Sequence, residues 1–246
     1  MRFYVELVTD SNKELVLPIQ YNYFIQSALY RSLDQDFASF LHEQGYESGG
    51  RKFKLFTFSR LMGRFQINKD TIAFKPPIKL VVSSPVNEFC QSLINGLLAK
   101  EAFQLEKNYL RVESVRVENP GVNGETLKMR LLSPVVAYST LLRPEGTKYT
   151  CYFQPGENEF ARLINENLRN KYEALYDKNT PEVSVDIKPL RQPRLHVMRY
   201  KGIVIKGYSA PLELKGPKPL LQLALDAGLG SKNSMGFGCG ELTGAG

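Results

Sequence analysis

Near its C-terminus the chain reads Gly228-Leu229-Gly230-Ser231-Lys232-Asn233-Ser234-Met235-Gly236-Phe237-Gly238-Cys239-Gly240. Five of these thirteen positions are glycine, and the glycines flank a short polar tip that contains Lys232, Asn233 and Ser234. Because glycine has no side chain and adopts positive φ freely, such a loop can bring backbone N–H groups against a phosphate oxygen. A tight, bulged connection between a helix and a terminal strand has the same composition, so both interpretations stay open.

This Gly-rich stretch does not match the common phosphate-binding motifs. No Gly-Lys-Ser/Thr run opens a helix, as the Walker motif requires, and Asn233 stands where the dinucleotide-binding motif has its third glycine. The stretch therefore indicates a candidate contact with an anion without naming the ligand.

The composition is that of a basic globular protein. The 246 residues carry a net charge of +7, which favours nucleic acid or an anionic membrane surface as partner; a merely well-solvated surface is the alternative. The apolar runs are too short for a transmembrane helix, and residues 1–7 alternate like a strand instead of forming a signal-peptide core. Cys90, Cys151 and Cys239 are odd in number and far apart, which indicates a reducing cytoplasm and argues against a zinc site or a disulfide framework.

The first half of the chain predicts the element order β-α-β-β-α-β. Apolar residues alternate from Phe3 to Leu7, and a helix is expected from Pro18, with a 3.6-residue apolar stripe as far as Leu29. This order is typical of ferredoxin-like or RRM-like domains. The remaining elements are expected as a basic, aromatic-rich strand at residues 51–59, strands between 72 and 83, a helix at 85–100, and a strand or hairpin at 103–117.

The second half repeats this order loosely, after a candidate boundary at Asn119-Pro120-Gly121. A last short helix begins at Pro219 and ends where Gly228 takes the position after the C-cap. We therefore expect an α+β fold of two tandem ferredoxin-like domains, at residues 1–120 and 121–246, with the Gly-rich loop near the C-terminus. The other elements of the second half are strands near 127–137, 149–153, 183–189 and 195–205, and a helix over 160–175.

Basic residues interleaved with aromatic ones dominate the segment from Lys188 to Lys218, where Glu213 is the single acid between those lysines. Arg199 and Lys201 are expected on one side of a strand, because they lie two residues apart. A basic ribbon of this kind suits an RNA backbone with unstacked bases. A hairpin that is merely soluble is the alternative, and His196 is interpreted as a structural residue or an RNA contact.

Together these features resemble the RAMP superfamily, and within it the sixth Cas family, the CRISPR repeat-processing endoribonucleases. The likeness covers essentially the whole chain. It continues in family order through Met1-Arg2-Phe3, Tyr30, Leu41-His42-Glu43, Lys54-Leu55-Phe56-Thr57-Phe58-Ser59, Asn95-Gly96-Leu97-Leu98 and Leu132-Ser133-Pro134-Val135.

The resemblance implies an enzyme that cuts CRISPR precursor RNA within its repeats without a metal or other cofactor. The 2′-hydroxyl beside the scissile phosphate attacks in line, which leaves a 2′,3′-cyclic phosphate and a 5′-hydroxyl. Tyr30, His42 and Lys54 fall at the catalytic positions. The residues expected to bind RNA are Arg51, Lys52, Arg191, Arg194, Arg199, Lys201, Gly228, Gly230, Lys232, Asn233, Gly236 and Gly238.

The residue types agree with this chemistry. Histidine, with an ordinary pKa near ~6.5, can carry protons at neutral pH, so His42 is expected to be the main proton carrier. Lys54 or its neighbour Lys52 can hold the non-bridging phosphate oxygens as their charge grows. Tyr30 is expected on the helix face turned away from the core, free to orient the 2′-hydroxyl or the phosphate; which of Tyr30 and His42 is acid or base stays open.

Two rival functions remain. A RAMP protein without catalytic activity that binds repeat or guide RNA in an effector complex would share the basic surface. A metal- or nucleotide-using ferredoxin-like enzyme is weaker, because the acidic pair Asp34 and Asp36 has no further ligand at a metal-binding spacing. The sequence leaves open whether the chain forms a homodimer and whether it joins an effector complex of Cas proteins.

Overall fold

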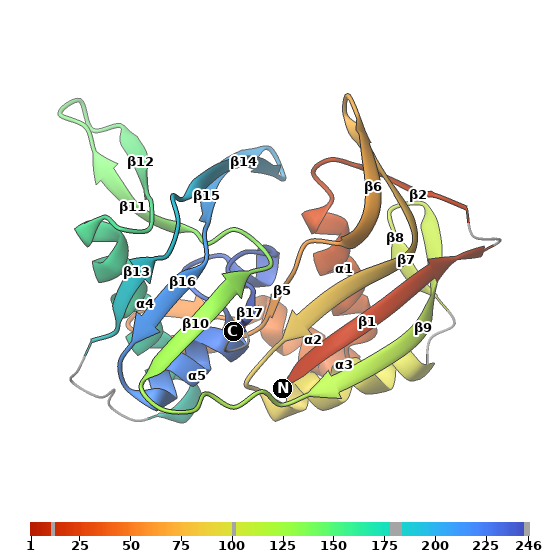
Figure 1. The fold of residues 1–246 in the computed structure, drawn as a ribbon, viewed down its shortest axis with the longest axis horizontal. Coiled ribbons are helices and arrows are strands. Elements are labelled where there is room, and N and C mark those ends of the chain that lie inside the picture. The colour runs from red at the N-terminus through yellow and green to blue at the C-terminus, as the bar shows by residue number, and fades with distance from the viewer. Residues whose placement is uncertain (11–12, 100–101, 178–183, 244–246) are drawn as a thin grey trace.

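The computed structural model describes residues 1–10, 13–99, 102–177 and 184–243 of the chain (Figure 1). Within these ranges no helix has the length and apolar character needed to cross a membrane.

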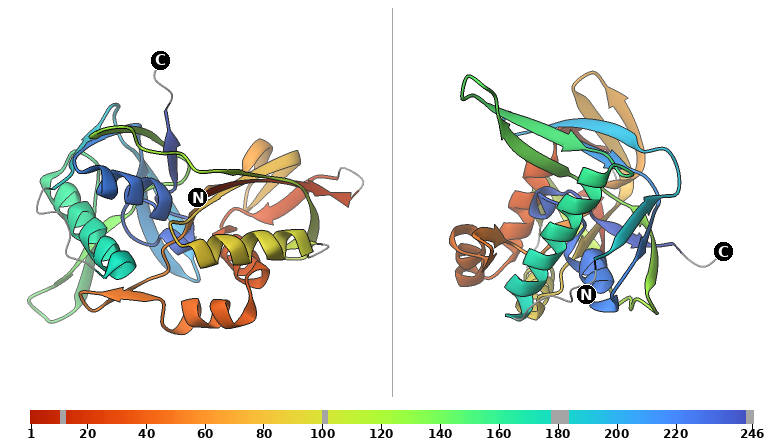
Figure 2. Two further views of the ribbon diagram at one scale, coloured as in Figure 1. Left: turned by 90° about the horizontal axis from the view of Figure 1, so that it is seen from below. Right: turned by 90° about the vertical axis from the view of Figure 1, so that its left-hand side faces the viewer.

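A central strand, β1 (Arg2–Thr9), organises the N-terminal half. It pairs antiparallel with β7 (Thr71–Ser83) on one side and with β9 (Asn108–Glu118) on the other. Helices α1 (Asn22–Ser32) and α3 (Asn87–Ala99) lie behind this sheet in Figure 1, and the view from below in Figure 2 shows the same layering. The arrangement is the ferredoxin-like β-α-β-β-α-β unit that alternation and helical periodicity predict.

Shorter elements extend this unit. Strands β2 (Leu15–Pro18), β5 (Thr57–Phe58) and β6 (Met62–Asn68) pair with β7, and β8 (Phe103–Leu105) pairs with β9. Helix α2 (Gln35–Glu43) follows α1 and leads into a hairpin of β3 (Tyr46–Ser48) and β4 (Arg51–Phe53). This hairpin carries Arg51 and Lys52, and it places Lys52 next to the end of α2.

The C-terminal half is a second ferredoxin-like unit. Its sheet has the order β13-β16-β10-β17, with β10 (Thr126–Leu131) between β16 (Leu212–Lys215) and β17 (Gly240–Leu242), and β13 (Asp186–Pro189) at the edge. Helices α4 (Asn158–Tyr176) and α5 (Lys218–Ala227) lie behind this sheet (Figure 1). Two hairpins project from it, β11 (Ala137–Leu142) with β12 (Lys148–Phe153) and β14 (Arg194–Tyr200) with β15 (Ile203–Ser209). The α+β fold of two tandem ferredoxin-like units is confirmed.

The two halves share apolar packing. Phe3, Val5 and Leu7 of β1 are buried in the first core, as the alternation predicts. That core also contains Leu223 and Ala227 of α5, although the rest of α5 packs into the second core. The last helix therefore joins the two halves.

Several element boundaries differ from the sequence prediction. Helix α1 begins at Asn22 and not at Pro18, because residues 15–18 form β2 and pair with β7. The strand expected at 51–59 is broken into β4 and β5, and Leu55 between them has a positive φ of 51°. The predicted strand from residue 127 ends at Leu131, and part of the strand expected at 183–189 lies outside the described residues.

Gly96 shows how closely the N-terminal helices pack. A Cβ at this position of α3 would overlap the backbone carbonyl of Ser32, the last residue of α1. Only glycine therefore permits this approach of the two helices.

We expect Gly96→Ala to lower the free energy of unfolding by roughly 2–4 kcal/mol, because backbone must move to admit the methyl group. Urea denaturation followed by circular dichroism measures the change. Gly121→Ala is the matched control, since nothing lies within 4 Å of a Cβ there. Equal stability of the two variants would contradict this account of the α1–α3 contact.

Candidate active site and RNA-binding surface

Tyr30 and His42 line the same pocket. It has a volume of about 430 Å³ and lies between the last turn of α1 and one side of α2. His42 is exposed in the last turn of α2, and Gly45 follows it with a φ of 68°. The structure brings Tyr30 of α1 and His42 of α2 to one pocket, whose walls are Tyr30, Arg31, Leu33, Gln35, Ala38, Ser39, His42 and Glu43.

The Tyr30 side chain is more enclosed than the sequence predicts. It packs against the first core, and its ring meets that of Phe56 edge-on at a centroid distance of 5.9 Å. The expectation of a face turned away from the core is therefore wrong, because the Tyr30 ring packs on Phe56 and on the first core. Burial raises the pKa of Tyr30 to about 12, so its hydroxyl remains protonated at neutral pH and can donate a hydrogen bond.

Lys54 and Lys52 hold the C-terminal end of α2. The Nζ of Lys54 donates to the carbonyl oxygens of Leu41 and His42, the second at 3.1 Å, and the Nζ of Lys52 donates to the carbonyl of Glu43 at 3.1 Å. The last carbonyls of a helix have no partner within it and carry the negative end of its dipole, so two ammonium groups stabilise this end. Burial, and secondarily the charge of Lys52, lowers the pKa of Lys54.

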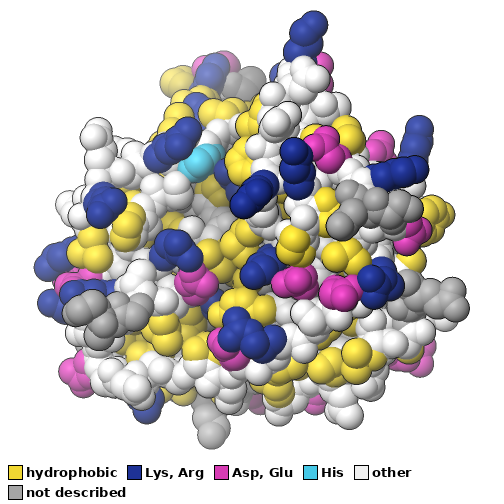
Figure 3. Space-filling view, turned by 45° about the vertical axis from the view of Figure 1, so that its right-hand side comes forward, with side chains coloured by type: hydrophobic (Ala, Val, Ile, Leu, Met, Phe, Trp, Pro, Cys, Tyr) yellow, Lys and Arg dark blue, Asp and Glu magenta, His cyan; other side chains and the backbone are white. Residues whose placement is uncertain are grey.

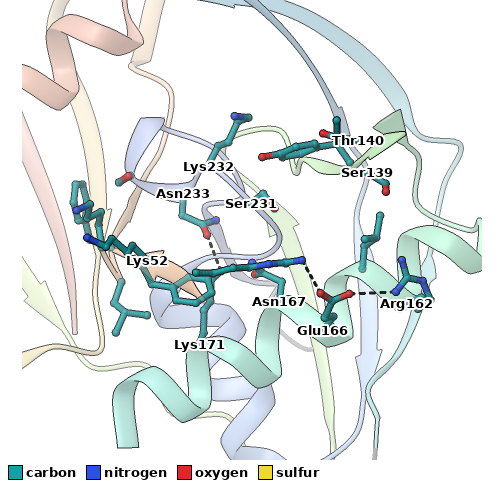
Figure 4. A pocket seen from close by; sticks show the side chains of 18 residues that line it. Lys52, Ser139, Thr140, Arg162, Glu166, Asn167, Lys171, Ser231, Lys232 and Asn233 are labelled. Carbon is teal, nitrogen blue, oxygen red and sulfur yellow. Dashed lines mark hydrogen bonds and ion pairs between the residues drawn. The ribbon is translucent and has the colours of Figure 1, made fainter. Parts of the chain in front are cut away.

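A second pocket, of about 690 Å³, lies between the two halves (Figure 4). Its walls come from β4 and the residues after it, from β11, from α4 and from the Gly-rich loop. Glu166 accepts hydrogen bonds from Arg51 at 2.7 Å and from Arg162 at 3.2 Å on its two carboxylate oxygens. Lys54 lines this pocket and not the one shared by Tyr30 and His42, so the structure connects Lys54 to His42 through the end of α2.

Lys171 holds the Gly-rich loop from beneath. Its fully buried Nζ donates to the carbonyls of Gly228 at 2.7 Å and Gly230 at 3.0 Å, and to Oδ1 of Asn233 at 2.6 Å. Burial lowers the pKa of Lys171 to about 7, whereas the three acceptors favour the ammonium form, which alone carries three hydrogens.

The glycines of the loop have a packing role. A Cβ on Gly238 would overlap the carbonyl of Leu229, and one on Gly236 would overlap the Phe58 ring. Side chains of the first half also bind loop carbonyls: Asn22 donates to Met235 at 2.9 Å and Thr57 donates to Phe237 at 2.9 Å. Contact of Gly228, Gly230, Asn233, Gly236 and Gly238 with RNA stays a prediction, and the described contacts of these buried residues are with the protein itself.

Lys232 is the basic residue at the tip of this loop. It is half-buried, and its Nζ lies 5.0 Å from the centre of the Tyr138 ring on β11. The ammonium group remains on the wall of the pocket between the halves.

The β14–β15 hairpin carries most of the other basic residues. Arg194 and Arg199 are exposed on β14, and Arg191 is exposed in the segment before it. Lys201 does not share a strand face with Arg199, because β14 ends at Tyr200 and Lys201 enters the turn with a φ of 47°. Its Nζ lies 4.5 Å from the centre of the Tyr23 ring on α1.

On the face drawn in Figure 3, lysine and arginine side chains surround a shallow central hollow.

His196 on β14 is half-buried, with Nε2 2.7 Å from Oγ of Ser209 on β15. Burial, together with the charges of Arg60 and Arg194, lowers the pKa of His196 to about 4. The hydrogen bond with Ser209 agrees with the interpretation of His196 as a structural residue.

Comparison with known proteins decides the family. The family described as CRISPR associated protein Cas6, C-terminal, matches residues 117–242, and the family described as CRISPR-associated protein Cas6, N-terminal, matches residues 16–116. The chain belongs to the Cas6 family. Its α+β fold of two tandem ferredoxin-like units is shared by a solved member of this family.

Curated Cas6 relatives align over nearly the full length. The CRISPR-associated endoribonuclease Cas6 1 of Methanocaldococcus jannaschii is 29% identical over 250 residues, which cover 97% of this chain and 91% of the relative. The CRISPR-associated endoribonuclease Cas6 of Pyrococcus furiosus is 29% identical over 254 residues, covering 99% and 90%. A solved CRISPR associated protein Cas6 superposes with a TM-score of 0.81 at 27% identity over 99% of both chains.

In this Cas6 chain, sequence reasoning missed the residues that come from α4. Lys171 lies on the apolar stripe with Ile164 and Leu168, where a charged side chain indicates a buried partner. Asn167 lies on the same buried face of α4, whereas the contact of Glu166 with Arg51 carries no comparable signal, because Arg51 comes from β4. Among the described residues, no group of three His, Cys, Asp or Glu side chains lies close enough together to hold a metal ion.

The lowered pKa of His196 predicts a pH-dependent stability. Between its folded value of about 4 and its ordinary value of 6.5, the unfolded chain binds more protons, so the free energy of unfolding should fall as pH drops through this window. Urea denaturation between pH 4 and pH 7 measures the slope, and His196→Gln should flatten it. An unchanged slope in this variant would assign the effect to another group.

Proposed function

We propose that this chain is an endoribonuclease that cuts CRISPR precursor RNA within its repeats and produces mature guide RNA. The family supports the activity, and the curated relatives carry the name CRISPR-associated endoribonuclease. The observation that carries the proposal is the pocket that Tyr30 and His42 line together, with His42 exposed to an incoming strand.

The proposed reaction is a transesterification that needs no metal. The 2′-hydroxyl attacks the neighbouring phosphorus in line, a 2′,3′-cyclic phosphate forms, and the bond to the 5′-oxygen breaks, so the other product ends in a 5′-hydroxyl. One group must take the proton of the 2′-hydroxyl, and another must supply a proton to the leaving oxygen. A phenol keeps its proton at neutral pH, whereas a neutral imidazole can accept one, so we assign Tyr30 the donor role and His42 the base role.

Lys54 contributes a positive charge beside this pocket. Its ammonium holds the carbonyl of His42 and so positions the end of α2. The same charge can stabilise the phosphate oxygens as they become more negative. Lys52 holds Glu43 in the same manner, so it provides a second, more exposed charge.

We assign catalysis to an N-terminal domain of residues 1–120 and most RNA contacts to a C-terminal domain of residues 121–246. The two largest apolar clusters and the two largest sheets support this division. We place the reaction in the cytoplasm, where one chain or a homodimer could pass its product to an effector complex of Cas proteins. The proposed RNA contacts are Arg51, Lys52, Arg191, Arg194, Arg199, Lys201, Lys232 and Asn233, on a loop shaped by Gly228, Gly230, Gly236 and Gly238.

His42→Ala should lower the cleavage rate of repeat RNA by roughly 10²–10⁴, because a positioned proton carrier contributes about that much. RNA affinity should stay near that of the wild type. Single-turnover cleavage of end-labelled repeat RNA, beside a filter-binding assay, measures both quantities. His196→Ala is the matched control and should cleave at the wild-type rate when RNA is saturating.

The same assay separates the enzyme from a RAMP protein that only binds RNA. Repeat RNA with a 2′-deoxy sugar at the cut site should bind normally and remain intact, since the nucleophile is missing. A wild-type protein that binds repeat RNA and never cuts it would instead be a RAMP protein without catalytic activity.

Cleavage should proceed at the same rate in EDTA as in magnesium. The reason is that the proposed proton transfers and charge stabilisation come from His42, Tyr30 and Lys54. Product ends should carry the cyclic phosphate, which is detected by its resistance to phosphatase until acid opens the ring. Activity that EDTA abolishes and magnesium restores would rule out the metal-free mechanism.

A further inference from the structure

Among the described residues, Arg31 is the only lysine or arginine that lines the pocket of Tyr30 and His42. It is exposed and lies in the last turn of α1, directly after Tyr30. Lys54, in contrast, lines the pocket between the two halves, and its ammonium donates to carbonyl oxygens at the end of α2. The lasting positive charge in the wall of the Tyr30 and His42 pocket is therefore that of Arg31.

Two neutral acceptors hold the Arg31 guanidinium in place. Its Nη1 donates to Oγ of Ser27, one turn earlier on α1, at 2.9 Å, and its Nη2 donates to the carbonyl of Gln104 on β8 at 2.7 Å. No carboxylate of the described residues forms an ion pair with this guanidinium. The group is thus oriented before a substrate arrives, and the protein does not neutralise its charge.

The anchored guanidinium keeps donors for a ligand. Arg31 uses one hydrogen of Nη1 and one of Nη2, so its Nε–H and the second hydrogen of each terminal nitrogen have no partner among the described residues. The planar donors of a guanidinium match the oxygens of a phosphate, and such charge-assisted hydrogen bonds are stronger than neutral ones. The unused donors therefore suit a phosphate group.

The other fixed charge in the wall of this pocket is negative. Glu43 follows His42, is exposed, and has no ion pair among the described residues. Because a neutral imidazole adds no charge, the walls without Arg31 would repel a phosphate, and the repulsion would grow as the phosphate gains charge during the reaction. Arg31 offsets Glu43 at the stage when the charge on the phosphate oxygens is greatest.

We propose that Arg31 is a further catalytic residue, whose guanidinium donates to a non-bridging oxygen of the scissile phosphate and stabilises it as its charge grows. The inference deepens the proposed function and rests on it, because it takes the pocket of Tyr30 and His42 as the place of cleavage. Lys54 supports the same step through the end of α2, which it holds, whereas Arg31 contacts the phosphate directly.

Arg31→Gln should lower the single-turnover cleavage rate at saturating repeat RNA by roughly 10²-fold, because one donor to the developing charge is lost. RNA affinity should stay near that of the wild type. Arg31→Lys keeps a charge without the planar donors and should recover part of the lost rate. Arg111→Gln is the matched control and should cut at the wild-type rate. Arg111 is also exposed in the first half, but it pairs with Glu113 at 2.7 Å and lines neither pocket.

A phosphorothioate at the cut site gives a measurement that a structural role would not change. Sulfur accepts hydrogen bonds more weakly than oxygen, so the wild type should cut the diastereomer that presents sulfur to Arg31 more slowly than the other. In Arg31→Gln this ratio of rates should fall towards one, because the donor to the replaced oxygen is already missing. A variant that keeps the wild-type ratio would overturn the contact.

Failure of this inference differs from failure of the nuclease proposal. Since the Arg31 side chain is exposed, the thermal unfolding midpoint of Arg31→Gln should lie near that of the wild type. A folded Arg31→Gln that cuts as fast as an active wild type, or loses only affinity, would remove Arg31 from the reaction and leave the nuclease in place. A wild type that never cleaves would contradict the proposed function, and the role of Arg31 with it.

Discussion

The ammonium group of Lys171 is the contact on which the junction of the two halves depends. It is buried beneath the Gly-rich loop and gives a hydrogen bond to each of three oxygens there. Water is excluded from this position, so the loop carbonyls have few other donors. The loop in turn accepts hydrogen bonds from Asn22, Gln26 and Thr57 of the first half. Lys171 of α4 thereby positions the Gly-rich loop against which α1 packs.

The same junction covers the side of α1 on which Gln26 lies, one turn before Tyr30. The face of α1 that would otherwise meet solvent is covered through Gln26, which binds both Ser234 of the loop and the hydroxyl of Tyr200 on β14. The enclosed phenol keeps its proton, while His42, on the shorter helix α2, remains exposed. The proposed assignment of donor and base to these two side chains follows this difference in burial.

Local pattern was sufficient to predict the two ferredoxin-like units. Alternation in β1 and the apolar stripes of α1, α3 and α4 depend on neighbours in sequence, and the structure follows them. Pairing between distant segments could not be read in this way. Residues 15–18 look like the start of a helix until β7 is present to pair with them, and Lys201 looks like part of a strand until the turn after Tyr200 is seen.

The site was predictable to a similar extent. A histidine and a tyrosine in family order lie in one pocket, but Lys54 lines the adjoining one, because its ammonium reaches the end of α2. Asn167 and Lys171 are polar residues on the apolar stripe of α4, which indicates buried partners, but nothing in the nearby sequence reveals that β4 lies beside Glu166. A local sequence pattern cannot predict a contact between residues more than a hundred positions apart, such as that of Arg51 with Glu166.

The lysines at the end of α2 have a consequence for substrate capture. Lys52 and Lys54 have already given up part of their hydration to backbone oxygens before any strand arrives. Transfer of either ammonium to a phosphate would exchange one oxygen acceptor for another, so the dehydration of the cation would not have to occur during the encounter. The carbonyls at the end of α2 would then be hydrated by water. The last turn of α2, which carries His42, would become more mobile while the scissile phosphate is being aligned.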